Sequence, residues 1–140
     1  MLEAAVAGVR AEARRLGIAR PLVLGVTVLT SVGEGSSSQL TQQTLTLAQA
    51  AARAGCDGIV ASAQDAEALR RRFGTRLSIV CPGIRPSRTR RQDQRRVCTP
   101  AEAMRRGADA LIIGRPITEA SRPRSAAQAI LNEMEDVDGC

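Results

Sequence analysis

The sequence contains no lysine and no histidine, so all 20 of its basic residues are arginine. Without histidine, the commonest general base of enzymes is missing from the chain. Without lysine, the chain itself supplies neither a Schiff-base amine nor an ammonium group as proton donor. The residues printed in this sequence therefore provide no histidine base and no lysine amine for catalysis.

Aromatic residues are almost absent as well, with one Phe and no Trp or Tyr. Hydrophobic residues make up 44% of the chain, so we expect an aliphatic core of Ala, Leu, Ile and Val. The stacking platforms that bind single-stranded nucleic acids are missing. No apolar run approaches the roughly 20 residues of a membrane helix, and we expect no membrane partner.

The formal net charge of +6 has two interpretations. It fits a polyanionic partner such as nucleic acid, or a coding bias that replaces lysine by arginine, which we favour. The cysteines match no metal-binding spacing, which predicts no metal site; they are Cys56, Cys81, Cys98 and Cys140. The N-terminal stretch is charged and amphipathic rather than a signal peptide, so we expect free thiols in the cytoplasm.

Helical and strand patterns alternate along the chain. Helical periodicity and terminal glycines predict helices over residues 2–16, 41–55, 63–74, 99–107 and 125–135. The fourth of these begins with Thr99, Pro100 and Glu102, which are typical of a helix start. Runs rich in aliphatic residues predict strands over residues 21–30, 57–62, 76–84 and 108–114. Strands that are apolar on both faces and alternate with helices indicate an α/β protein with a parallel sheet.

Two architectures fit this alternation. One is a partial (β/α)8 TIM barrel, with about the last four βα units preceded by one helix, and the other is a small open sheet. A complete barrel usually needs ~250 residues, and a half-barrel leaves two edge strands that favour association. We expect one domain over residues 1–135 and a disordered tail over residues 136–140.

Two of the expected strands end in a glycine close to an arginine. Gly83 and Arg85 follow the third strand, and Gly114 and Arg115 follow the fourth. Functional residues gather at strand ends in parallel α/β proteins, and phosphate often binds after the last two strands of a barrel. Glycine lets a ligand approach the backbone, and guanidinium groups suit phosphate oxygens. The pattern predicts a phosphate site, although turn glycines with solvated arginines would look the same.

Longer motifs surround these strand ends. The stretches "LGVTVLTS", "GCDGIVASAQDAEALR", "CPGIRP" and "DQRRVCTPAEAMRRGADALIIGRPIT" resemble the orotidine 5'-phosphate decarboxylase family, in its bacterial style. The resemblance runs from about Leu2 to about Leu131 and covers the C-terminal half of the family's barrel. It implies an enzyme family that converts OMP to UMP and CO2 in pyrimidine biosynthesis, with no cofactor.

The resemblance also implies roles for matching residues. Thr30 would lie near the nucleotide, Arg85 would contact the ligand, and Gln94 would reach its phosphate. Gly114 and Arg115 would hold the 5'-phosphate through backbone N–H groups and the guanidinium.

The family's catalytic Asp–Lys–Asp–Lys array, with its Asp-x-Lys-x-x-Asp motif, belongs to the first half of the barrel and has no counterpart here. We therefore assign no catalytic residue and expect negligible activity from this chain alone, as for a truncated product, a misplaced start or one piece of a split enzyme. The alternative is a non-catalytic phosphate-binding half-barrel that self-associates or complements a missing N-terminal half. A nucleic-acid binder is the least favoured reading. The acidic residues Asp57, Asp65, Asp93 and Asp109 are expected at the surface or in turns.

Overall fold

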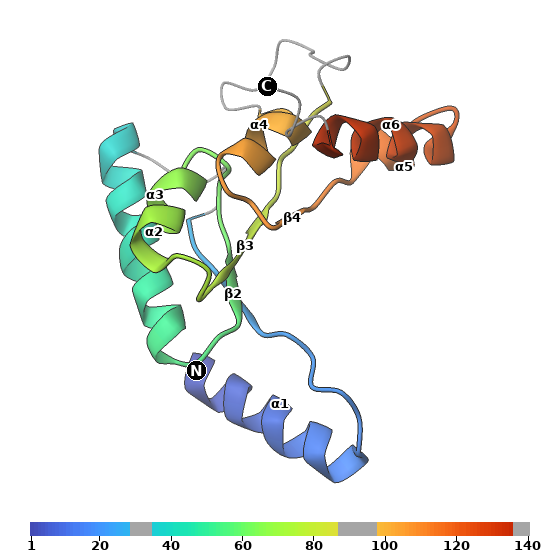
Figure 1. Cartoon of the computed structure of the whole chain (residues 1–140). Helices are drawn as coiled ribbons and strands as arrows, with labels where there is room; N and C mark the ends of the chain where they lie inside the picture. Colours follow the sequence, from blue (N-terminus) through green and yellow to red (C-terminus); the bar gives the residue numbers. More distant parts are fainter. Residues whose placement is uncertain (29–34, 87–97, 136–140) are drawn as a thin grey trace.

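A computed structural model describes residues 1–28, 35–86 and 98–135 of the chain (Figure 1). The helices are α1 (Leu2–Leu16), α2 (Ser37–Arg53), α3 (Ala66–Phe73), α4 (Pro100–Arg105), α5 (Arg115–Thr118) and α6 (Pro123–Glu135). The strands are β1 (Leu24–Val26), β2 (Gly58–Val60), β3 (Ser78–Cys81) and β4 (Ala110–Leu111). None of the helices in these ranges is long and apolar enough to cross a membrane.

The four strands form one parallel sheet in the order β1-β2-β3-β4. Each strand is followed by at least one helix before the next strand begins, which confirms the predicted α/β class. Every observed strand is shorter than its prediction, because only a few residues of each apolar run pair with a neighbour. The residues after these short strands continue as loops toward the carboxyl edge of the sheet.

Capping side chains mark the starts of α2 and α4. The Thr99 hydroxyl accepts a hydrogen bond from the Glu102 N–H, and the Glu102 carboxylate accepts one from the Thr99 N–H. This capping box confirms the predicted start of α4. Helix α2 begins four residues before its predicted start, because Ser36 and Gln39 form a second capping box.

Helix α5 was not predicted from the sequence. Arg115 and Pro116 follow the strand predicted over residues 108–114, and they open a four-residue helix, Arg115–Thr118. Proline fits the first turn of a helix, where its missing N–H is not needed. Helix α6 packs on both α4 and α5, so this short helix joins the C-terminal layer.

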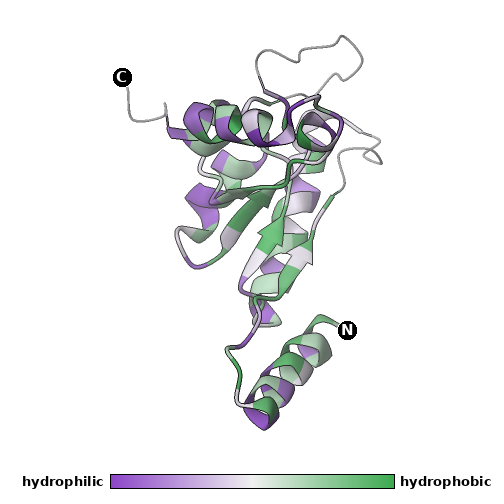
Figure 2. Cartoon of the chain, turned by 90° about the vertical axis from the view of Figure 1, so that its right-hand side faces the viewer, coloured by the Kyte–Doolittle hydropathy of each residue, from purple (hydrophilic) through white to green (hydrophobic). Residues whose placement is uncertain are grey.

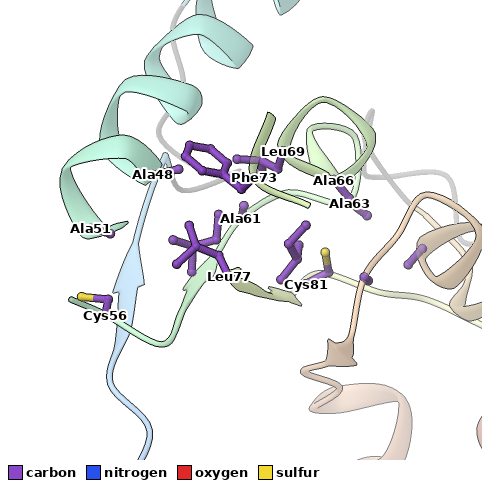
Figure 3. Packing of buried hydrophobic residues seen from close by; sticks show 14 of the residues in the cluster. Ala48, Ala51, Cys56, Ala61, Ala63, Ala66, Leu69, Phe73, Leu77 and Cys81 are labelled. Atoms are coloured by element: carbon purple, nitrogen blue, oxygen red, sulfur yellow. The ribbon is translucent and has the colours of Figure 1, made fainter. Parts of the chain in front are cut away.

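The core lies between the sheet and helices α2 and α3, which are stacked on one of its faces (Figures 1 and 3). Ala48 and Ala51 from α2 and Leu69 and Phe73 from α3 meet Ile59 of β2 in this core. The core is aliphatic as expected, except that it also contains the single Phe and buried cysteines. Small side chains let α2 approach β1 closely, since a Cβ at Gly25 would lie 2.8 Å from the Ala51 Cβ.

In the part of the chain that the structure describes, helices cover one face of the sheet and leave the other face open. Figure 2 looks onto the second face, where the apolar strands stand in front of the helices. Helix α1 lies apart from the sheet and meets the rest through its N-terminal half, where Val6 joins the core (Figure 1). The result is an open, one-sided layer of the kind that half of a (β/α)8 barrel forms.

Candidate functional site

The strand ends that the sequence singles out come together at the carboxyl edge of the sheet. β3 and β4 are neighbours in parallel register, with Val80 opposite Ala110 and Cys81 opposite Leu111. The Ile112 N–H also donates to the Cys81 carbonyl over 2.9 Å, which continues this pairing beyond the strands. The segments that start at Pro82 and Ile112 therefore leave the sheet side by side.

After β3, the chain turns through Gly83 and reaches Arg85. Gly83 has a φ of 74°, a left-handed conformation that side chains other than glycine rarely adopt. The Arg85 N–H donates to the Cys98 carbonyl over 3.1 Å, and Ile84 forms a parallel bridge with Cys98. The half-buried Arg85 guanidinium donates through Nη1 to the Ile84 carbonyl at 2.9 Å. These contacts fix the backbone of Arg85 beside the segment that leads into α4.

After β4, Gly114 is the N-cap of α5, and Arg115 is its first residue. The Gly114 carbonyl accepts hydrogen bonds from the N–H groups of Ile117 (2.8 Å) and Thr118 (3.1 Å). A Cβ built on Gly114 meets nothing within 4 Å, and both Gly114 and Arg115 are exposed. The backbone here is thus open to a ligand, and the arginine side chain stands next to it.

The structure therefore brings Arg85, Gly114 and Arg115 to the same edge of two adjacent strands. Thr30 and Gln94, the other residues expected at the site, lie outside the described residues, as do Asp93, Cys140 and the tail from residue 136. Within residues 1–28, 35–86 and 98–135, no group of three or more Cys, Asp or Glu side chains is placed to hold a metal ion.

Asp57 and Asp109 stabilise the sheet through ion pairs and hydrogen bonds. Asp57 precedes β2 and pairs with Arg20, and Asp109 precedes β4 and pairs with Arg70. Each carboxylate also accepts a hydrogen bond from a strand N–H, that of Val23 (2.8 Å) for Asp57 and that of Ile79 (2.7 Å) for Asp109. These two pairs lie at the amino edge of the sheet, opposite to the candidate site.

Asp65 lies in a turn, as expected, but its side chain is buried rather than at the surface. Its carboxylate accepts hydrogen bonds from the hydroxyls of Thr41 (2.5 Å) and Thr44 (3.2 Å), which both lie on α2. Asp65 thus joins the loop after β2 to α2. Sequence reasoning missed this role because nothing in the local pattern links residue 65 to a helix more than twenty residues earlier.

Cys81 and Cys98 are free and buried, as expected for small residues in apolar positions. Burial raises the pKa of the Cys81 thiol to about 12, with smaller contributions from Cys98, Asp109 and Asp65. Burial also raises the pKa of Cys98. Neither thiol is therefore an activated nucleophile.

A basic cavity of about 340 Å³ lies between α1 and the segment that follows it. Its lining residues are Arg10, Ala13, Arg14, Gly17, Ile18 and Arg20. Arg20 is engaged by Asp57, and Arg14 belongs to the last turn of α1, where a cation favours the helix dipole. Arg20 and Arg14 thus have structural roles, and none of the lining residues belongs to the predicted phosphate site.

The chain is similar to a known family over nearly its whole length. The model of the "Orotidine 5'-phosphate decarboxylase / HUMPS family" matches residues 1–130. Two curated relatives named orotidine 5'-phosphate decarboxylase come from Moorella thermoacetica and Nitrobacter winogradskyi. The first is 46% identical, with 98% of this chain and 57% of the relative covered, and the second is 49% identical, with 81% and 50% covered.

Solved structures agree. The crystal structure of orotidine 5'-phosphate decarboxylase from Lactobacillus acidophilus matches with a TM-score of 0.69 and 34% identity, over 84% of this chain and 51% of that one. The chain thus spans about half the length of the relatives it matches, and its fold is a partial barrel. Together, the sequence motifs, the parallel sheet and these matches show that the chain belongs to the orotidine 5'-phosphate decarboxylase / HUMPS family.

Proposed function

We propose that this chain is the half of an orotidine 5'-phosphate decarboxylase that binds the nucleotide phosphate. The observation that carries the proposal is the meeting of the β3 and β4 ends, which puts Arg85, Gly114 and Arg115 at one edge of the sheet. Family membership supplies the ligand class, a pyrimidine nucleotide 5'-phosphate such as OMP or UMP. Thr30 and Gln94 complete the proposed set.

Arg115 and Gly114 are the centre of this proposed site. A phosphate oxygen can approach the backbone at Gly114, because no Cβ stands there and the space above it is open. The forked, permanently charged Arg115 guanidinium matches two phosphate oxygens at once. Arg85 adds a second guanidinium from the neighbouring strand end.

Catalysis requires more than this half provides. The chain has no lysine to protonate the carbon left when CO2 departs, and its described carboxylates at residues 57, 65 and 109 have structural partners. We propose that the chain holds the nucleotide and that decarboxylation depends on residues supplied by another segment. The chain alone would then bind UMP without forming it from OMP.

The binding proposal is tested by thermal unfolding with UMP or inorganic phosphate. A ligand at ten times its Kd adds about 1.4 kcal/mol to the free energy of unfolding, a Tm rise of roughly 4 °C for a chain of this size. Arg115→Ala should remove most of this rise. Arg14→Ala, at the basic cavity, is the matched control and should retain it. An Arg115→Ala protein that responds like the unchanged chain would show that the phosphate binds elsewhere.

The catalytic proposal is tested by incubating the purified chain with OMP and following UMP by chromatography. We expect no UMP above the level of a protein-free sample. Clear turnover by the 140-residue chain would contradict the proposal that the catalytic residues come from another segment. This result would leave the binding test unaffected.

A further inference from the structure

One face of the sheet is apolar and uncovered in the part of the chain that the structure describes. We call it the open face, and it consists of Leu24, Val26, Val60, Val80, Ala110 and Ile112. The strand register aligns Val26, Val60, Val80 and Ala110 in one row across all four strands. Val26 is 59% exposed and Ile112 is 51% exposed, so water reaches both ends of this face.

The orientation of these side chains follows from the alternation along each strand. Ile59 and Ile79 point into the helix-covered core and are almost fully buried. Val60 and Val80 come next in their strands, so they point to the other side. Figure 2 views this side and shows apolar strands in front of the helices. An apolar surface of this kind marks a site of association.

The sheet also has two unpaired edges. β1 and β4 end the strand order, so one side of each backbone has no strand partner among the described residues. Leu22, just before β1, is 68% exposed and extends the apolar surface along that edge. A partner on the open face would therefore form the most stable complex if it also paired parallel strands with β1 and β4.

A second copy of this chain meets both requirements. Four parallel strands are half of the eight in a closed barrel. A two-fold axis parallel to the strands keeps all eight strands in one direction and sets β4 of each copy beside β1 of the other. The open face has no charged side chain, so it can be buried without bringing the net charge of +6 on each copy into the interface.

We propose that two copies of this chain associate through their open faces, with the β1 edge of one copy beside the β4 edge of the other. The open faces then become the interior of a barrel with two-fold symmetry. The carboxyl ends of all eight strands lie at one end of it, so the two candidate phosphate sites face the same side. Because the association depends on apolar burial, it does not require the ligand to bind.

Sedimentation equilibrium across a concentration series tests the proposal. We expect a dimer for the unchanged chain and monomers for Val26→Asp and for Ile112→Asp, which place a carboxylate at opposite edges of the open face. Leu47→Asp is the matched control, because Leu47 is 43% exposed on α2, outside the open face. This variant should remain a dimer, and circular dichroism should show the same helix content in all four proteins.

If an aspartate variant does not fold, Val26→Thr provides the same test with a side chain of similar shape. Val26 occurs twice in the dimer, so the dissociation constant should rise at least about tenfold. Three results would overturn the proposal. They are a monomer at every concentration, a dimer that Val26→Asp and Ile112→Asp leave intact, and a monomer that pairs only with the separately expressed remaining half of a relative. None of them depends on the UMP experiment.

Discussion

The guanidinium of Arg20, just before β1, forms an ion pair with the carboxylate of Asp57, just before β2. The same carboxylate accepts a hydrogen bond from the Val23 N–H, so one side chain holds the beginnings of two neighbouring strands together. Asp109 links β3 and β4 in the same way through the Ile79 N–H, and its ion-pair partner is Arg70 of α3. Charged pairs thus stabilise the amino edge of the sheet, while the candidate site occupies the carboxyl edge.

The Asp57 pair predicts a pH dependence of stability. The hydrogen bonds from Arg20 and then from Val23 lower the pKa of Asp57 from 3.8 to about 2. A carboxyl whose pKa is depressed in the folded state stabilises the fold above its unfolded pKa. That contribution is lost as the pH falls from about 4 to about 2. Asp57→Asn should cost about 1–2 kcal/mol of unfolding free energy at pH 7 and much less at the acid end of this window.

Urea unfolding at neutral pH and near pH 2 measures this difference. Glu67→Gln is the control, because Glu67 pairs with Arg71 at the exposed surface of α3. It should change stability by no more than about 0.5 kcal/mol at neutral pH. A cost of Asp57→Asn that stays constant down to the acid end would contradict the proposed role of its ionised form.

The hydrogen bonds from α2 to the buried Asp65 carboxylate predict that the threonine hydroxyls of this helix stabilise the fold. Thr44 is fully buried, and Thr44→Val would remove one of the two hydroxyl donors of Asp65 while keeping the side chain's shape. A buried acceptor that loses a donor costs about 1–3 kcal/mol. Thr46→Val on the same helix removes an exposed hydroxyl bonded to the Gln42 carbonyl and should cost less than about 0.5 kcal/mol. Equal costs in urea unfolding would argue against this link between α2 and the loop after β2.

At Gly58 we expect that the addition of a single methyl group destabilises the folded protein. A Cβ there would lie 2.9 Å from Leu24 Cδ2 and closer still to the Ser78 carbonyl oxygen of the adjoining strand. Gly58→Ala should destabilise the protein by roughly 2–3 kcal/mol or prevent folding, because the β2–β3 register would have to shift. Gly8→Ala in α1 meets nothing within 4 Å and should stabilise the protein by up to about 1 kcal/mol. Thermal unfolding of the two variants should show opposite shifts in Tm.

The buried thiol of Cys81 predicts protection from alkylation. Its pKa of about 12 leaves almost no thiolate at pH 8, and its side chain has no exposed surface. Iodoacetamide should therefore modify Cys81 only in urea, and peptide mass spectrometry identifies the modified residue. Fast labelling of Cys81 in the folded protein would show that the core between β3 and α4 opens readily.

Several features followed from the sequence alone, because they depend on local chemistry. Alternating apolar patterns predicted the α/β class and the parallel sheet, and the Thr99–Pro100–Glu102 start of α4 was predicted from its capping side chains. The family was evident from motifs such as "PGIR" and "IGRPIT", since they combine backbone turns with ligand-binding residue types. Strand lengths were overestimated, because an apolar run does not reveal how many of its residues pair.

Only the tertiary structure decided which surfaces meet and which stay open. The pairs Arg20–Asp57 and Arg70–Asp109 join residues 37 and 39 positions apart, a distance over which no local pattern operates. Asp65 reaches the threonines of α2 for the same reason. The strands are apolar on both sides, and within residues 1–28, 35–86 and 98–135 helices cover one side only. The sequence determined that this sheet has two apolar faces, and the packing of α2 and α3 on one of them leaves the other open among the described residues.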